Sequence, residues 1–371
     1  MKNNTPLRVA FVLPSLTAGG AERVLITLMN GLPRAEFSPA MICVNDGGPL
    51  RDLIATDIDF TALYKSERMV SPEKSLPALY RALRAIKPDI VVATMAQMNF
   101  AVLVLRPLFP KTQFIVREAI TPSFILEKRA RAAPVIRAAY KRLYPLAACV
   151  ISPAQMIIDE FSSVLKMDVT RHICLPNPVD ADKIRGDGVA HIPDVPPNTI
   201  RFIAAGRLHS QKGFDRLLDS LPALAGDWHL TILGEGPERS ALEAQIRNLG
   251  LESRVSLVGL VDKPWPYYAA ADAFLLPSRW EGLPNVALES LCCGTPVIAM
   301  YEAGGIGEIA AAAPQAVVVC RSMTEFIERM GCVQTDNATH YRPSLLPALY
   351  ERSAVIEKFT QILRRVAGRP A

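Results

Sequence analysis

Ser278-Arg279-Trp280-Glu281-Gly282-Leu283-Pro284-Asn285-Val286-Ala287-Leu288-Glu289 is the stretch that decides the fold of this chain. It lies between two short apolar runs, 273–276 and 297–300, that have the composition of buried strands. Pro284 opens a helix within this stretch, and Gly294 ends the helix before the second strand. The stretch therefore predicts a strand, loop, helix and strand of a parallel sheet, with Glu281 in the loop and Glu289 in the helix. Ligands of such sheets bind beyond the carboxyl ends of the strands.

Short apolar runs alternate with helical patterns along the whole chain. The expected strands of the first half are 9–13, 40–44, 90–93, 114–116 and 149–152. Those of the second half are 200–204, 229–233, 255–258, 273–276, 297–300 and 317–319. A stretch rich in Pro, Gly and Asp, 180–198, separates the halves. Because 371 residues are about twice the usual domain size, the sequence predicts two doubly wound α/β domains.

Three features of the second half resemble one enzyme family: the stretch quoted above, the run Cys293-Gly294-Thr295-Pro296-Val297 and the pair Gly304-Gly305. They are similar to the donor-binding signature of the retaining GT-B glycosyltransferases of family four, which include many bacterial cell-surface polysaccharide enzymes. The resemblance implies two Rossmann-like domains facing a cleft, with the acceptor mainly on the amino-terminal side and the donor nucleotide on the other. The expected division is an amino-terminal domain 1–180, a linker 181–198, a nucleotide-sugar domain 199–345 and a helical segment 346–371 that crosses back to the first domain.

Two cations follow the first expected strand of the second half. Gly206 and Arg207 come directly after that strand, and Lys212 precedes the next helix. Cations at a strand-to-helix turn, beside the positive end of a helix, suit a diphosphate. In the resembling family this arginine and lysine bind the diphosphate and neutralise its charge as it departs, so we expect both to be catalytic. The alternative, two solvated loop cations, is disfavoured by the glutamates downstream.

The resemblance assigns separate roles to the two glutamates. It places Glu289 at the ribose hydroxyls, for which a carboxylate is a suitable acceptor. It places Glu281 beside the donor sugar, where the carboxylate would orient hydroxyls and support charge at the anomeric carbon. The alternative for each is an ordinary surface carboxylate. Backbone amides near the phosphates are expected from the intervening residues Gly282, Leu283, Pro284 and Asn285.

Backbone contacts to the donor are also expected at four other positions. Gly19 and Gly20 follow the first strand and precede Ala-Glu-Arg, as in the resembling family, where such glycines let the backbone approach a phosphate or sugar. Two adjacent glycines also suit any tight turn, which is the alternative. Gly234 and Val261 follow the next two strands, and we expect them near the nucleotide.

Acceptor contacts are expected from the first half. Arg117 and Glu118 follow the strand 114–116 and match an Arg-Glu pair found at the cleft of many relatives. We expect this pair to contact the acceptor or the donor sugar, with a structural ion pair as the alternative. Asn99 is a third candidate. The sequence departs from the family twice: the segment 94–99 lacks the usual histidine, and 311–319 replaces a Gly-Leu-Leu-Val-Pro segment.

The net charge of +5 is concentrated in one segment. Residues 106–142 hold nine Lys or Arg against two Glu, interleaved with aromatic and aliphatic side chains. This pattern favours basic segments that lie on anionic lipid headgroups, with a solvated helical face as the alternative. We expect no nucleic acid partner, because no such binding motif accompanies the charge. No apolar run reaches the ~20 residues of a membrane span and no signal-peptide pattern opens the chain, so we expect a cytoplasmic protein peripheral to the inner face of the membrane.

Seven cysteines and five histidines are dispersed along the chain without metal-ligand spacing. We therefore expect the cysteines to be buried small hydrophobes, and we expect no metal and no cofactor.

Taken together, the resemblance implies retaining transfer of a hexose or N-acetylhexosamine from a nucleotide-diphosphate sugar to a lipid-linked, lipopolysaccharide or exopolysaccharide glycan. A UDP-sugar is expected ahead of a GDP-sugar, although the residues themselves do not discriminate the base. Retention in the family is explained by front-face attack, in which the leaving phosphate accepts the proton of the acceptor, so no protein base and no metal is required. The alternatives are a GT-B-like nucleotide-sugar epimerase and a non-catalytic sugar-nucleotide-binding subunit.

Overall fold

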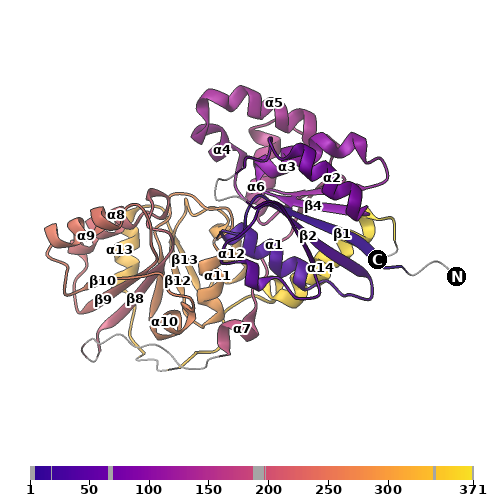
Figure 1. The fold of residues 1–371 in the computed structure, drawn as a ribbon. Helices are drawn as coiled ribbons and strands as arrows, with labels where there is room; N and C mark the ends of the chain where they lie inside the picture. The colour runs from indigo at the N-terminus through magenta and orange to yellow at the C-terminus, as the bar shows by residue number, and fades with distance from the viewer. Residues whose placement is uncertain are drawn as a thin grey trace. The chain divides into compact units, whose positions relative to one another are not determined.

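Two parallel β-sheets organise the chain, one in each of two units (Figure 1). The structure is a computed structural model that describes residues 5–17, 19–65, 70–186, 196, 198–336 and 340–369. Unit 1 comprises Met1–Pro178 and Ser353–Ala371, and unit 2 comprises Val179–Arg352. Helices flank both sheets, so the predicted pair of Rossmann-like folds is confirmed.

The sheet of unit 1 has seven strands in the order β3-β2-β1-β4-β5-β6-β7. The chain moves outward from β1 in one direction and from β4 in the other, so the switch point lies between these two strands. The strands are β1 (Leu7–Leu13), β2 (Phe37–Asn45), β3 (Asp59–Tyr64), β4 (Ile90–Thr94), β5 (Gln113–Arg117), β6 (Cys149–Ser152) and β7 (His172–Cys174). The helices are α1 (Gly20–Asn30), α2 (Leu76–Ile86), α3 (Ala96–Leu105), α4 (Pro122–Lys128), α5 (Ala133–Leu143), α6 (Gln155–Ser163) and α14 (Arg352–Val366), with 3₁₀ turns η1 (Arg51–Leu53), η2 (Arg106–Leu108), η3 (Ala130–Ala132) and η4 (Tyr144–Leu146).

The sheet of unit 2 has six strands in the order β10-β9-β8-β11-β12-β13, with its switch point between β8 and β11. The strands are β8 (Ile200–Ala205), β9 (Trp228–Leu233), β10 (Val255–Gly259), β11 (Ala273–Leu276), β12 (Val297–Met300) and β13 (Val317–Cys320). The helices are α7 (Ala181–Arg185), α8 (Phe214–Ser220), α9 (Arg239–Asn248), α10 (Trp265–Ala270), α11 (Asn285–Cys292), α12 (Ile306–Ala312) and α13 (Met323–Gly331), with 3₁₀ turns η5 (Ser210–Lys212), η6 (Leu221–Ala223) and η7 (Ala348–Tyr350).

Helix α14 packs into the core of unit 1, although it follows unit 2 in the sequence (Figure 1). Its buried side chains have the spacing of one helical face: Val355, Phe359, Ile362 and Leu363. The ring of Phe359 lies 6.3 Å from the ring of Phe11 on β1. Arg364 donates from Nε and Nη2 to the carboxylate of Glu36, at 2.9 and 2.8 Å. The helix is therefore an integral part of the first unit's core.

Two predicted features of the fold differ in the structure. The edge strands β3 and β7 were not predicted, because β3 begins with a charged residue and β7 has only three residues. The segment 181–185 was predicted as linker but forms α7, whose N-cap Asp180 accepts a hydrogen bond from the backbone N–H of Lys183 at 3.2 Å. The rest of the predicted linker at 187–195 and 197 lies outside the described residues.

Candidate active site

Two side chains meet beyond the switch point of the second sheet. Lys212 lies in the loop that follows β8, and Glu281 lies in the loop that follows β11. The Nζ of Lys212 is 2.6 Å from Oε1 of Glu281, and the two side chains are only 17% and 11% exposed. The structure thus brings a catalytic cation and a catalytic carboxylate of the sequence prediction into direct contact.

The carboxylate of Glu281 is fixed by its own loop. The buried Ser278 donates from Oγ to Oε1 of Glu281 at 2.9 Å. The amide of Gln211, next to Lys212, donates to the carbonyl oxygen of Trp280 at 3.0 Å. These bonds hold the carboxylate in one orientation before any ligand binds.

Arg279 ties the Lys212 loop to the Glu281 loop. Its two Nη atoms each lie 2.7 Å from an oxygen of Asp215, and Nη1 also donates to the carbonyl oxygen of Ser210 at 2.8 Å. Its backbone N–H donates to the carbonyl oxygen of Gln211 at 2.8 Å. The hydrogen bonds from Arg279 hold the pKa of Asp215 below its usual value. No role for Arg279 follows from the sequence, because its partner Asp215 is 64 residues away.

Close backbone approach explains two glycines at this edge. A Cβ on Gly206 would lie 2.8 Å from Cε of Lys212, so the absence of a side chain lets the lysine stem cross the end of β8. Gly304 has a φ of +64°, and a Cβ there would lie 2.1 Å from the carbonyl oxygen of Glu281. The next residue, Gly305, donates its backbone N–H to the carbonyl oxygen of Gly282 at 2.7 Å. The loop after β12 therefore packs directly on the Glu281 loop.

Glu289 lies on α11, where its Oε2 accepts a hydrogen bond from Nε1 of Trp265 at 3.2 Å. Asn285 is the first residue of this helix, and Gly282 and Leu283 precede it as buried loop residues. The expectation of a backbone amide from Pro284 is wrong, because proline has no N–H. Pro284 instead caps α11 from an extended conformation.

The remaining donor candidates follow neighbouring strands of the same sheet. Arg207 follows β8 and its side chain is exposed to solvent. Val261 follows β10 and is half-buried. Gly234 follows β9 and donates its N–H to the carbonyl oxygen of Gly259 at 2.7 Å, so its amide is already used within the fold.

Gly19 and Gly20 lie in unit 1, where Gly19 is the N-cap of α1 and Gly20 is its first residue. Glu22 in the first turn of α1 is buried, and burial raises the pKa of its carboxyl group. Of the two ligands expected at these glycines, a sugar hydroxyl is favoured over a phosphate, because a carboxylate nearby repels an anion.

The three candidates for acceptor contact are buried in unit 1. Asn99, Arg117 and Glu118 are 0%, 2% and 1% exposed. Arg117 donates to Oδ1 of Asn177 at 2.5 Å, and Glu118 accepts hydrogen bonds from the hydroxyls of Tyr140 and Tyr144. Burial raises the pKa of Glu118 to about 7 and lowers the pKa of Arg117 to about 10. In the structure these side chains therefore make their contacts inside unit 1, as the structural alternative expects.

Met95 is a candidate that the sequence analysis missed. It follows β4 at the switch point of the first sheet and has a φ of +76°, which is rare for a residue with a side chain. Its side chain is 38% exposed. Backbone strain of this kind costs about 1–3 kcal/mol and gathers at functional sites. Methionine is not a turn residue, so no sequence pattern indicated it.

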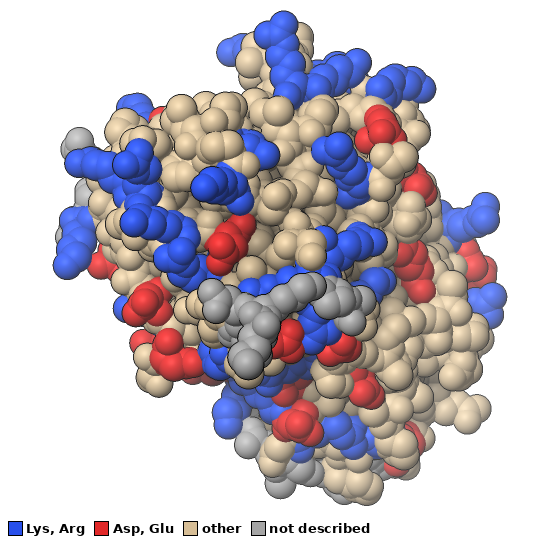
Figure 2. Space-filling view, turned by 90° about the vertical axis from the view of Figure 1, so that its right-hand side faces the viewer, with Lys and Arg blue, Asp and Glu red and all other residues tan. Residues whose placement is uncertain are grey.

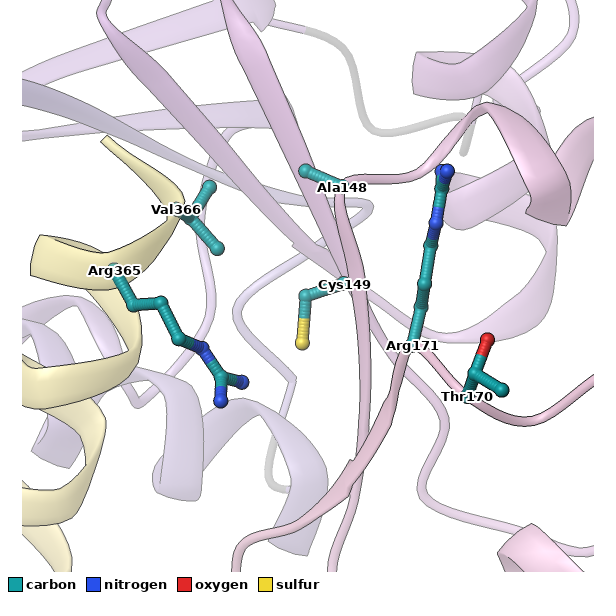
Figure 3. Close-up of a pocket in the computed structure, with 6 residues that line it drawn as sticks. All are labelled: Ala148, Cys149, Thr170, Arg171, Arg365 and Val366. Atoms are coloured by element: carbon teal, nitrogen blue, oxygen red, sulfur yellow. The ribbon is translucent and has the colours of Figure 1, made fainter. Parts of the chain in front are cut away.

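A cavity of about 320 Å³ lies elsewhere in unit 1 (Figure 3). Its lining residues are Ala148, Cys149, Thr170, Arg171, Arg365 and Val366. They precede or begin β6 and β7, or end α14, so the cavity lies at the amino ends of the strands. It is therefore separate from the candidate site, which lies at carboxyl ends.

The described residues also bear on a metal site and on a membrane-spanning helix. No group of three or more His, Cys, Asp or Glu side chains within the described ranges is placed to hold a metal ion. No helix among the described residues is both long and apolar enough to cross a membrane.

Comparison with known proteins identifies the family. Residues 18–183 match Glycosyltransferase Family 4, and residues 199–336 match Glycosyl transferases group 1. The chain is 28% identical over 307 residues to the N-acetylgalactosamine-N,N'-diacetylbacillosaminyl-diphospho-undecaprenol 4-alpha-N-acetylgalactosaminyltransferase of Campylobacter jejuni, covering 81% of this chain and 83% of that one. It is 25% identical over 320 residues to the UDP-Gal:alpha-D-GlcNAc-diphosphoundecaprenol alpha-1,3-galactosyltransferase of Escherichia coli, covering 80% and 79%.

Among solved structures, the fold is similar to the lipopolysaccharide outer core galactosyltransferase WaaB in its apo form. The TM-score is 0.71 at 20% identity, over 97% of this chain and 99% of that one. The chain therefore belongs to the GT-B glycosyltransferases of family four and is a hexosyltransferase.

Proposed function

We propose that the protein is a retaining glycosyltransferase that moves a hexose or N-acetylhexosamine from a UDP-sugar to a lipid-linked or lipopolysaccharide glycan. The observation that carries the proposal is the contact between Lys212 and Glu281 at the switch point of the second sheet. Open α/β sheets bind ligands at this point. The choice of UDP is supported by the name of the Escherichia coli relative, which specifies UDP-Gal.

Each side chain of the site has a role that follows from its chemistry. Lys212 and Arg207 bind the diphosphate, and their positive charges offset the charge that develops as the nucleoside diphosphate leaves. Glu281 is held by Ser278 and accepts hydrogen bonds from the sugar hydroxyls. Glu289 accepts hydrogen bonds from the ribose. A hydrogen bond to a charged partner contributes about 1.5–3 kcal/mol, which is roughly a tenfold to hundredfold change in affinity for each such contact.

The proposed reaction exchanges two bonds at the anomeric carbon. The acceptor oxygen attacks from the face that the phosphate leaves, so the new C–O bond has the configuration of the old one. The departing phosphate oxygen takes the proton from the acceptor hydroxyl. The role of the protein is to position the reactants and to stabilise charge, and the two cations supply the positive charge without a metal.

The acceptor is proposed from the relatives and from the surface of unit 1. Both relatives are named for acceptors linked to undecaprenol through a diphosphate. We call the basic surface the exposed cations in and between α4 and α5, which are Lys128, Arg129, Arg131, Lys141 and Arg142. Figure 2 shows blue side chains gathered along the upper part of this face, at the height of α5 in Figure 1. A surface of this kind attracts anionic headgroups at about 1 kcal/mol per cation, so the protein would lie on the inner face of the membrane.

Many apolar side chains interleaved with the cations are not available for contact with lipid. Five of the apolar side chains interleaved with the charge are buried in unit 1, namely Phe114, Leu126, Ile136, Tyr140 and Tyr144. The exposed large apolar side chains in this part of the chain are Leu108, Ile120, Val135 and Leu146. Membrane contact would therefore be mainly electrostatic and sensitive to salt.

The test is a product assay with labelled UDP- and GDP-hexoses and N-acetylhexosamines. Each donor is incubated with synthetic polyprenyl-diphosphate-linked N-acetylhexosamine acceptors in a chelating buffer, and the linkage is determined by NMR. The proposal predicts a lengthened lipid-linked glycan whose new bond keeps the anomeric configuration of the donor. Conversion of the donor sugar without an acceptor would identify an epimerase, and nucleotide binding without turnover would identify a non-catalytic subunit.

A further inference from the structure

We infer that Trp265 is a positioning residue that fixes the carboxylate of Glu289 and makes the donor site select ribose over 2′-deoxyribose. The inference rests on the proposed function, which places Glu289 at the ribose. Trp265 begins α10, 24 residues before Glu289, and nothing in the sequence motif includes it.

Trp265 contacts one face of α11 at two points. Its Nε1 donates to Oε2 of Glu289 at 3.2 Å, and its carbonyl oxygen accepts from Sγ of Cys293 at 3.6 Å. Glu289 and Cys293 are four residues apart, so they project from the same side of the helix. Both the side chain and the backbone of Trp265 are therefore hydrogen-bonded to the part of α11 that carries the carboxylate.

The docking of α10 on this region is rigid. Thr295, just after α11, donates from Oγ1 to the carbonyl oxygen of Tyr268 in α10 at 2.6 Å. Tyr268 is buried, and its ring packs edge-on against Phe274 of β11 at 5.2 Å. The indole is therefore held by the core and not by the glutamate alone.

The chemistry of the indole suits this task. Its N–H only donates and carries no charge, so it orients a carboxylate without neutralising it. Nζ of Lys183 lies 5.9 Å from the centre of the ring, and a cation over the ring strengthens the N–H as a donor. A carboxylate has about four acceptor positions, and the indole N–H occupies one of them.

Fixing the carboxylate in advance has a measurable consequence. A glutamate side chain that must order itself on binding loses affinity for the hydroxyls that it accepts, and affinity for every other part of the nucleotide is unchanged. Without the indole N–H, we expect about a fivefold to tenfold loss in affinity for a ribonucleotide and a smaller loss for its 2′-deoxy analogue, which keeps only the 3′ hydroxyl.

The experiment measures calorimetric affinities of UDP and 2′-deoxy-UDP for Trp265→Phe, with Trp265→His as a rescue variant that restores a ring N–H. Glu289→Gln serves as the benchmark for loss of the charged carboxylate. Trp228→Phe is the matched control, because Nε1 of Trp228 donates to the carbonyl oxygen of Leu224 at 3.1 Å inside the core of the same unit. The inference predicts that the ratio of the two affinities falls in Trp265→Phe, recovers at least partly in Trp265→His and is unchanged in Trp228→Phe.

Two outcomes overturn the inference and differ in what else they remove. If Glu289→Gln loses the discrimination but Trp265→Phe keeps it, Trp265 is only structural and the proposed function stands. If both variants keep the discrimination, Glu289 does not bind the ribose, and that assignment fails together with the inference. If Trp265→Phe does not fold, the affinity ratio of Trp265→His decides, since a wild-type ratio supports the inference and a collapsed ratio opposes it.

Discussion

Replacing Arg279 by alanine should weaken diphosphate binding indirectly, through the loop that carries Lys212. Arg279 holds the loop of Lys212 through Asp215, Ser210 and Gln211. Its ion pair with Asp215 is partly solvated, with side chains 32% and 42% exposed, so the pair contributes about 0.5–1 kcal/mol. The bond to the Ser210 carbonyl adds about 1 kcal/mol. We therefore expect a stability loss of about 1–2 kcal/mol, which lowers the melting temperature of a unit of this size by roughly 2–8 °C.

The effect on binding has an upper limit set by Lys212 itself. A charged contact from Lys212 contributes about 1.5–3 kcal/mol, and a misplaced loop forfeits only part of it. We expect Arg279→Ala to lose roughly threefold to tenfold in affinity for UDP and nothing for uridine, which lacks the diphosphate. Isothermal titration of both ligands measures this difference. Arg254→Ala is the control, because Arg254 stacks on Trp228 and precedes β10 at the amino ends of the strands.

A double variant tests the reasoning most sharply. If Arg279 acts through Lys212, the double variant should bind UDP about as weakly as Lys212→Ala alone, because the two residues act on one contact. Fully additive losses, or an equal loss of uridine affinity, would refute the claim that Arg279 positions the lysine.

Three further predictions concern the rest of the chain. Burial raises the pKa of Glu118 from 4.5 to about 7, so the folded state binds the proton more tightly and the free energy of unfolding should fall as pH rises from about 4.5 to 7. In urea unfolding, Glu118→Gln should reduce this fall by up to about 3 kcal/mol. An unchanged pH dependence in the variant would contradict the prediction. Phe359→Ala removes a buried ring between α14 and β1 and should cost about 3–5 kcal/mol in unfolding experiments on unit 1, whereas a loss below 1 kcal/mol would show that α14 is dispensable. Replacing Arg131, Lys141 and Arg142 together by glutamine should weaken sedimentation with phosphatidylglycerol vesicles by about 100-fold at low salt and leave uncharged phosphatidylcholine vesicles unaffected; equal binding to both lipids would exclude the basic surface.

The sequence contained most of the donor site because its residues follow consecutive strands of one sheet. Lys212 was predicted at the diphosphate and Glu281 at the donor sugar, and the topology explains their contact, since β8 and β11 are neighbours on either side of the switch point. The amide expected of Pro284 was an error that the sequence itself could have prevented. Arg279 and Trp265 could not be found in this way, because each acts through a partner that only the fold brings near.

The burial of the acceptor candidates could not be predicted from the sequence, for a physical reason. Arg117 and Glu118 follow a strand, as ligand-binding residues do, but two tyrosines from α5 and η4 cover the glutamate and Asn177 holds the arginine. Polarity at the end of a strand does not distinguish an open site from a polar network buried inside a unit. Met95 shows the opposite case, since its positive φ is visible only in the structure.

The central claim is that the second sheet binds a nucleoside diphosphate through Lys212 without a metal. Calorimetric titration of UDP, GDP and ADP in a chelating buffer, with the wild-type protein and Lys212→Ala, tests it directly. The account predicts that UDP binds and that Lys212→Ala weakens this binding by about tenfold or more. Failure of all three nucleotides to bind, or equal affinity in the variant, would contradict the claim.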